Sequence, residues 1–143
     1  MKCLRDYLAG ALAVVLLALP VVARAADPAV AEEKPEPVIP GITIERKSGD
    51  GLLGIEILSG NFKLSFYDKG KQPVRADFPR ALLRWDVTYK NVQERVILTP
   101  GGDGTFLTSP RAIRPPYNFQ LFITLIGEGE GQESETYVIR FRQ

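Results

Sequence analysis

Five arginines are the side chains of this sequence best suited to bind a ligand: Arg75, Arg80, Arg84, Arg111 and Arg114. A guanidinium group is a planar fork that binds carboxylate or phosphate through two parallel hydrogen bonds, and it also stacks on aromatic rings. Aromatic residues or prolines stand near each of the five along the chain. The sequence therefore predicts a candidate site for an anion or a partner, formed by Arg80, Arg84, Arg111, Arg114 and Tyr117.

A second interpretation of these arginines stays open. Arg80 and Arg84 fall on the polar side of a predicted strand, and acidic residues stand nearby at Asp77, Asp86 and Glu94. Exposed ion pairs of this kind contribute little energy and are common on solvated sheet surfaces. The arginines would then keep the domain soluble without binding anything specific.

The chain lacks the side chains that most catalytic and metal sites use, because it has no histidine and its one cysteine and one methionine are Cys3 and Met1. Copper and structural zinc need thiolate, thioether or imidazole ligands, and a serine nucleophile normally needs a histidine base. No calcium-loop spacing surrounds the acidic residues of the turns. We therefore predict no catalytic residue, no metal and no cofactor. Carboxylate pairs such as Asp86 with Glu94 leave a carboxylate-dependent hydrolase as an unfavoured alternative.

The first 25 residues have the three parts of a secretory signal peptide. A charged start with Lys2 and Arg5 precedes an apolar run broken at Pro20, and the run ends in an A-x-A site at 23–25. We expect cleavage after Ala25 and a periplasmic or secreted protein without a stable membrane anchor. An uncleaved anchor is the alternative, but the apolar run is shorter than the roughly 20 residues that a spanning helix needs.

Residues 26–40 contain four prolines and few large apolar residues, so we predict a disordered proline-rich linker. Removal of residues 1–25 leaves 15 basic and 16 acidic side chains, a formal charge of −1. This balance argues against nucleic-acid binding. No disulfide can form in the remaining chain, so the apolar core alone must hold the folded part, residues 41–143.

The segment 79–90 is expected to be the central strand of that folded part. Its odd-numbered residues from Ala81 to Tyr89 are apolar and include the single tryptophan, while most of its even-numbered residues are polar. Such a period of two is typical of a half-buried strand. Leu82 is the one apolar residue on the polar side.

Other segments repeat this alternation and are separated by glycine-rich or polar turns. We predict further strands over 42–47, 52–58, 62–67, 94–99, 105–108, 117–126 and 134–142, and the last two should pair as an antiparallel hairpin. The loop 109–116 carries three prolines, which exclude a central strand. It is either a stiff exposed segment that presents Arg111 and Ile113 or a connection between sheets.

About seven to eight short strands in roughly 100 residues are typical of an all-β, immunoglobulin-like β-sandwich. The inward phase of the strands predicts a structural core of Phe62, Leu64, Phe66, Leu83, Trp85, Val87, Phe119, Leu121, Ile123, Tyr137, Ile139 and Phe141.

The segment 62–83, FKLSFYDKGKQPVRADFPRALL, resembles the strand, turn and following strand of bacterial exported immunoglobulin-like modules, including the YtkA-like group associated with metal handling, and its turn reads D-K-G-K-Q-P-V. The resemblance covers about a fifth of the folded part and implies the architecture alone. The methionines and histidines of a soft-metal site are missing here.

These observations favour an exported, non-catalytic β-sandwich module that binds an envelope protein or polymer through a sheet face, an edge strand or its loops. A binder of an anionic ligand through an arginine-lined sheet face is the second interpretation, and strong salt dependence would distinguish it. A subunit of a larger assembly is a further possibility.

Overall fold

The computed structural model describes residues 35–87, 89–129 and 134–143 of the chain. The predicted signal peptide and residues 26–34 of the predicted linker lie outside the described residues. No helix occurs within the described part, and accordingly no helix there could cross a membrane.

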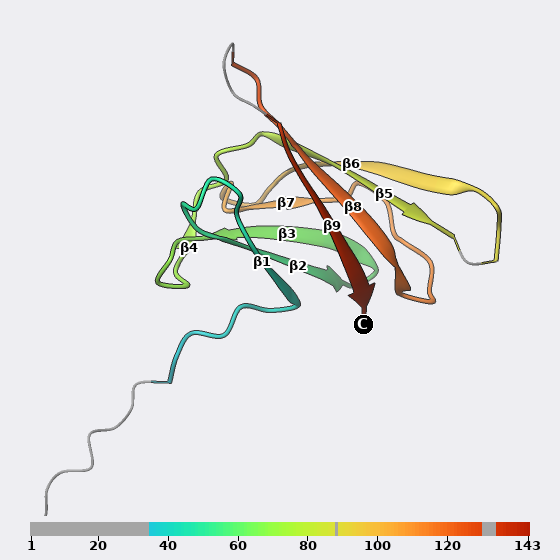
Figure 1. The fold of residues 1–143 in the computed structure, drawn as a ribbon, viewed down its shortest axis with the longest axis horizontal. Coiled ribbons are helices and arrows are strands. Elements are labelled where there is room, and N and C mark those ends of the chain that lie inside the picture. The colour runs from blue at the N-terminus through green and yellow to red at the C-terminus, as the bar shows by residue number, and fades with distance from the viewer. Residues whose placement is uncertain (1–34, 88, 130–133) are drawn as a thin grey trace, which may run out of the picture. The chain divides into compact units, whose positions relative to one another are not determined.

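Nine antiparallel strands make up the fold (Figure 1). They are β1 (Ile42–Glu45), β2 (Leu52–Leu58), β3 (Asn61–Tyr67), β4 (Pro73–Val74), β5 (Arg80–Asp86), β6 (Gln93–Gly101), β7 (Phe106–Thr108), β8 (Asn118–Ile126) and β9 (Glu135–Arg142). The all-β antiparallel class is thus confirmed, and β8 and β9 form the expected hairpin.

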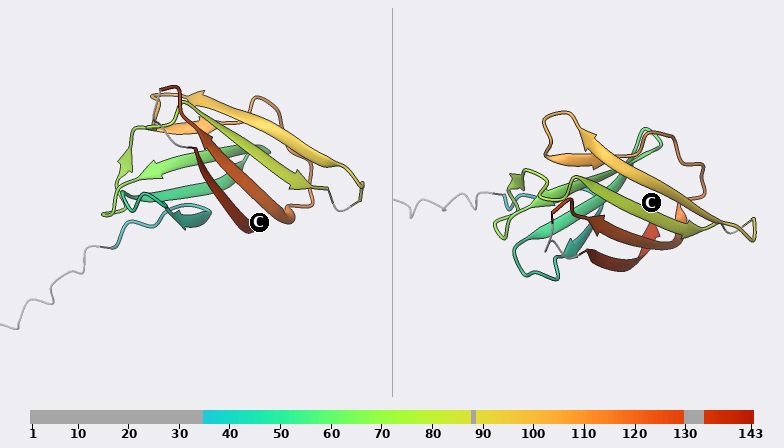
Figure 2. Two further views of the ribbon diagram at one scale, coloured as in Figure 1. Left: turned by 45° about the horizontal axis from the view of Figure 1, so that its top comes forward. Right: turned by 90° about the horizontal axis from the view of Figure 1, so that it is seen from above.

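The strands follow the order β1-β2-β3-β7-β6-β5-β8-β9, with β4 paired to β3. β6 pairs with both halves of the sheet. Its first part pairs with β5, in the half that also contains β8 and β9, and from Thr99 onward it pairs with β7, in the half that contains β1 to β4. The sheet therefore curls nearly into a barrel, as the two views of Figure 2 show. β1 and β9 are its two edge strands.

Three strands end two or more residues away from the sequence-based prediction: β1 at Glu45 instead of Lys47, β5 at Asp86 instead of Lys90, and β6 at Gly101 instead of Thr99. β5 ends at Asp86, because the Val87 and Lys90 amides hydrogen-bond within a tight turn, to Val92 O and Val87 O. Tyr89 is therefore exposed instead of buried. β6 continues through Pro100, which lies beyond the last β5–β6 pair at Leu98, so its missing N–H removes no bond of that ladder.

The ninth strand, β4, was not predicted. It has only two residues and begins with a proline, so no alternation of apolar and polar side chains reveals it. A turn over Asp68–Gln72 places β4 beside β3. The Asp68 carboxylate accepts a hydrogen bond from the Gln72 amide, and the Asp68 amide donates one to the Gln72 oxygen.

Ten of the twelve residues assigned to the core are buried, among them Trp85 at 3% exposure. Val87 and Ile139 are only partly buried and pack against the core from its margin. Val87 follows the end of β5, where the chain turns away. Ile139 points inward but lies on an edge strand with one neighbour.

Phe62 joins the two halves of the curled sheet. Its ring makes edge contacts with Trp85 of β5, Phe119 of β8 and Phe141 of β9, at centroid distances of 5.4, 6.2 and 5.8 Å. Phe119 and Phe141 stack on each other at 5.5 Å. These edge-to-face contacts add stability beyond the burial of their area.

The folded unit begins before the predicted boundary at Gly41. Ile39 is buried at 7% exposure, and a methyl group of its side chain lies over the backbone of Gly54, where any side chain would clash with it. Glu36 pairs with Lys71 at 2.9 Å. Ile39 is therefore packed on the outside of β2, and the compact unit includes the chain from Pro35 onward.

We expect Phe62→Ala to lower the free energy of unfolding by about 3–5 kcal/mol, because it removes the ring shared by all three contacts and leaves a cavity. Urea or thermal unfolding followed by tryptophan fluorescence measures the loss. Leu58→Ala, at an exposed position four residues earlier, is the matched control and should change stability by less than about 0.5 kcal/mol. Equal effects of the two variants would contradict the assigned core.

Candidate functional site

The outer surface of β6, β5, β8 and β9 carries a mixed apolar and basic patch, which we call the arginine face. Cross-strand pairing places Leu82 beside Ile97, Arg84 beside both Arg95 and Phe122, and Phe122 beside Val138. The arginine face is defined as Leu82, Arg84, Arg95, Ile97, Phe122 and Val138.

Two of its four apolar members are exposed and two are partly buried. Ile97 and Val138 retain 49% and 52% of their accessible surface, and Leu82 and Phe122 are half-buried. Scattered apolar residues are ordinary on protein surfaces, whereas large contiguous apolar patches are typical of interaction sites. The register, rather than the sequence, makes the group contiguous.

Arg84 lies at the centre of the arginine face. Its guanidinium carbon lies 5.8 Å from the centre of the Phe122 ring, so the charge is held against an aromatic surface. The Nε atom is buried and finds no hydrogen-bond partner among the described residues. Arg95 is directly opposite, so two cationic side chains share one cross-strand position without a carboxylate between them.

The structure does not bring the predicted site arginines together in one patch. Arg80 begins β5 on the same outer side as Arg84, as predicted, but lies four residues away and pairs with Glu128 at 3.1 Å. Arg111, in the β7–β8 loop, donates to the backbone oxygen of Arg95 at 3.0 Å and lies 3.9 Å from Glu94. Of the predicted site arginines, only Arg84 is a member of the arginine face as defined above, and Arg111 borders it through its bond to Arg95.

The last two predicted site residues lie elsewhere. Arg114 is exposed and lines a small cleft of about 20 Å³ beside Trp85 and Tyr89. Tyr117 packs against the core, and its hydroxyl donates to the Ile113 oxygen at 3.1 Å, so its role in the structure is to hold the loop. Ile113 is itself buried at 5% exposure, which contradicts its expected presentation to a partner.

Sequence reasoning missed Arg95, Ile97, Phe122 and Val138 as members of one surface. A signal was present, since Leu82 and Phe122 are apolar residues on the polar side of their strands. Their adjacency depends on the pairing of β5 with both β6 and β8, which the sequence does not specify.

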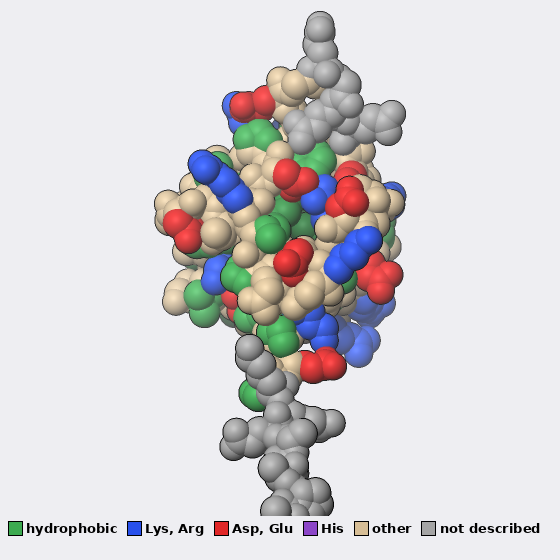
Figure 3. Space-filling view, turned by 90° about the vertical axis from the view of Figure 1, so that its left-hand side faces the viewer, with side chains coloured by type: hydrophobic (Ala, Val, Ile, Leu, Met, Phe, Trp, Pro, Cys, Tyr) green, Lys and Arg blue, Asp and Glu red, His purple; other side chains and the backbone are tan. Residues whose placement is uncertain are grey.

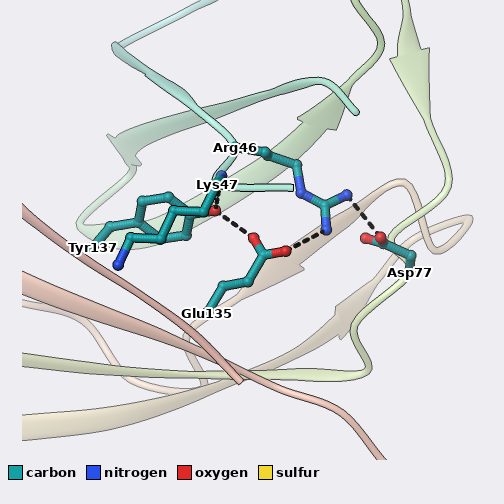
Figure 4. A network of polar contacts seen from close by, with 5 residues as sticks. All are labelled: Arg46, Lys47, Asp77, Glu135 and Tyr137. Carbon is teal, nitrogen blue, oxygen red and sulfur yellow. Dashed lines mark hydrogen bonds and ion pairs between the residues drawn. The ribbon is translucent and has the colours of Figure 1, made fainter. Parts of the chain in front are cut away.

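A second group of polar residues closes the curled sheet at one end (Figure 4). Arg46, just after β1, pairs with Asp77 at 2.7 Å and with Glu135 of β9 at 3.2 Å. Tyr137 donates a hydrogen bond to Glu135 and accepts one from the Lys47 amide at 3.0 Å. These contacts tie β9 to the segment after β1, where no backbone ladder joins them.

The network changes the pKa values of Glu135 and Tyr137. Burial of the Glu135 carboxyl would by itself raise its pKa, but the hydrogen bonds from Tyr137 and Arg46 and the Arg46 charge outweigh this and lower it. The pKa of Tyr137 is raised by burial and by the adjacent carboxylate. Glu135 is therefore held as a carboxylate and Tyr137 as a neutral hydrogen-bond donor, which suits a structural clasp.

No group of three or more histidine, cysteine, aspartate or glutamate side chains gathers within residues 35–87, 89–129 and 134–143. On the side shown in Figure 3, basic and acidic side chains are interspersed with hydrophobic ones and no single charge dominates.

Comparison with protein families, with characterised proteins and with solved structures finds no match for this chain. The arguments for function therefore come from the surfaces themselves.

Acid should weaken the network that Glu135 forms with Arg46 and Tyr137. A carboxyl group whose pKa is lowered by folding stabilises the fold above its unfolded pKa, here near the ordinary value of 4.5, and loses that contribution as the pH falls through the folded value. We expect Glu135→Gln to reduce stability at pH 7 and to flatten the decline between about pH 5 and pH 3. Chemical denaturation across that pH range measures it. Glu128→Gln, on the exposed pair with Arg80, is the control and should leave the profile unchanged.

Proposed function

We propose that this chain is an exported, non-catalytic binding module of immunoglobulin-like sandwich type, and that its arginine face docks an acidic envelope protein. The observation that carries the proposal is the contiguous group of exposed and partly buried apolar side chains around Arg84, whose guanidinium carbon lies 5.8 Å from the centre of the Phe122 ring. Export is supported by the signal-peptide pattern of residues 1–25. The absence of histidine from the whole chain, and of cysteine beyond Cys3, supports a non-catalytic role.

The composition of the arginine face favours a protein partner over a polymer. Binding energy at protein interfaces is concentrated in aromatic and arginine side chains within a desolvated patch. Phe122 and Arg84 supply such a pair, and Ile97 and Val138 add apolar surface that a charged polysaccharide would leave in water. A protein can cover both kinds of group at once.

Charge favours an acidic partner over a second copy of this chain. Arg84 and Arg95 lie opposite each other on neighbouring strands, and no carboxylate pairs with either among the described residues. In a two-fold symmetric dimer the same patch meets itself, which would bring these cations together. A partner with carboxylates around an apolar centre would pair with the two arginines and also cover the apolar side chains between them.

An anionic polymer is the second candidate, and the unpaired Arg84–Arg95 position favours it. Such a ligand would depend on the arginines alone, and its affinity would fall steeply with salt. The two candidates therefore differ in whether the apolar side chains matter.

We expect Ile97→Ser and Val138→Ser each to lower capture of an envelope protein by the immobilised chain at least about tenfold, because a desolvated apolar contact is lost. Arg95→Glu should lower it as well. Quantitative capture from envelope extract at low and at physiological salt measures these effects. Leu58→Ser, at an equally exposed leucine on β2, is the control and should bind like the unaltered chain.

Two results would contradict the proposal. Loss of capture with Arg95→Glu alone, together with salt-sensitive retention on an anionic matrix, would establish the polymer alternative. Equal capture by all four variants would show that the arginine face is not the binding site.

A further inference from the structure

The two edge strands of the curled sheet, β1 and β9, approach each other without forming a backbone ladder. We call the gap between β1–β2 and β9 the seam. One of its ends is closed by the contacts of Tyr137 with Lys47 and of Glu135 with Arg46. The other end is closed by the side chain of Gln143, which follows β9 and reaches β2.

The pairing register explains why β2 is uncovered at that end. β1 pairs Ile44 with Leu53 and Ile42 with Ile55, so the same register would place Pro40 opposite Ile57. Proline has no N–H and cannot donate to the Ile57 oxygen. The chain also leaves the sheet at Gly41, whose positive φ of 76° turns the preceding segment away. The main-chain groups of Ile57 that face away from β3 therefore lack a strand partner.

Gln143 fills this position with a side-chain amide. Its Oε1 accepts a hydrogen bond from the Ile57 amide at 2.8 Å, and its Nε2 donates to the Ile57 oxygen at 2.7 Å. One donor and one acceptor presented together to the same residue are what a neighbouring antiparallel strand provides. The Gln143 side chain thus imitates one residue of a missing strand.

Space for a longer segment exists beside this contact. A groove of about 330 Å³ runs between Ile42 and Glu56 on one side and Phe141 and Arg142 on the other. Glu56 is paired with Lys63 at 3.6 Å. Arg142 is exposed and makes no ion pair or side-chain hydrogen bond among the described residues, so the rim of the groove carries an uncompensated positive charge.

We propose that the seam is a strand-addition site that accepts an extended segment of another polypeptide. The main chain of that segment replaces the Gln143 amide on Ile57, and an acidic residue of the segment pairs with Arg142. Strand addition of this kind draws its affinity from backbone hydrogen bonds and its specificity from alternate side chains. The site is distinct from the arginine face and independent of the function proposed for it.

The test uses the full chain and three synthetic probes. The first is the extended acidic peptide acetyl-TVDVT-amide, the second has lysine in place of aspartate, and the third is the acidic peptide with its central amides N-methylated. Two-dimensional NMR of the isotope-labelled chain follows the Ile57 amide and gives the dissociation constants.

We expect the acidic peptide to bind and to shift the Ile57 resonance, the lysine peptide to bind more weakly, and the N-methylated peptide not to bind. Gln143→Ala should bind the acidic peptide about threefold to tenfold more tightly, because an internal competitor for Ile57 is removed. This gain distinguishes an occupied site from a merely structural contact, whose loss would not improve binding. Gln93→Ala, another exposed glutamine, on β6, is the matched control and should leave the affinity unchanged.

A second variant tests the charge independently of Gln143. Arg142→Glu should reverse the preference, so that the lysine peptide binds more tightly than the acidic one. The proposal is overturned if none of the peptides binds below about 1 mM, if the N-methylated peptide binds equally well, or if Gln143→Ala weakens binding. Unchanged peptide affinity in Ile97→Ser would separate this site from the arginine face, so either proposal can fail alone.

Discussion

The contact of Phe62 with Trp85, Phe119 and Phe141 is the interaction on which the curled sheet depends. β3 lies in one half of the sheet, and the three partners lie on β5, β8 and β9 of the other half. No cysteine follows Cys3, so no disulfide within the folded part can hold the halves together. The two halves are therefore held by side chains that exclude water between them, and β6 is the strand of the described residues that pairs with both halves.

Curling of one sheet around this core has two consequences for its surfaces. It brings the edge strands β1 and β9 near each other, yet side chains rather than backbone bonds cross the seam. It also gives every strand one face toward the core and one toward the outer surface. Apolar residues at the alternate positions, which do not face the core, therefore lie on the outer surface. Leu82, Ile97, Phe122 and Val138 are such residues, and the pairing of four strands gathers them.

Local alternation predicted most strands because each one buries every second side chain in the same core. The β8–β9 hairpin and the inward phase of Leu83 and Trp85 follow from that pattern alone. The passage of β6 from β5 to β7 at Thr99 and the contact of Gln143 with Ile57 depend on segments far apart in the chain. The arginine face could not be predicted for the same reason, since Arg84 and Arg95 become neighbours only through register.

The arginine face and the seam would recognise a partner by different physical means. The arginine face offers side chains, so its specificity would come from the arrangement of charges around an apolar centre. The seam offers the main chain of Ile57, which any extended polypeptide could pair with, so the Gln143 amide has a protective effect there. An unprotected strand edge pairs readily with other chains and promotes aggregation. An amide that satisfies one residue of the edge limits this pairing to segments that gain enough from the adjoining groove and from Arg142 to displace it.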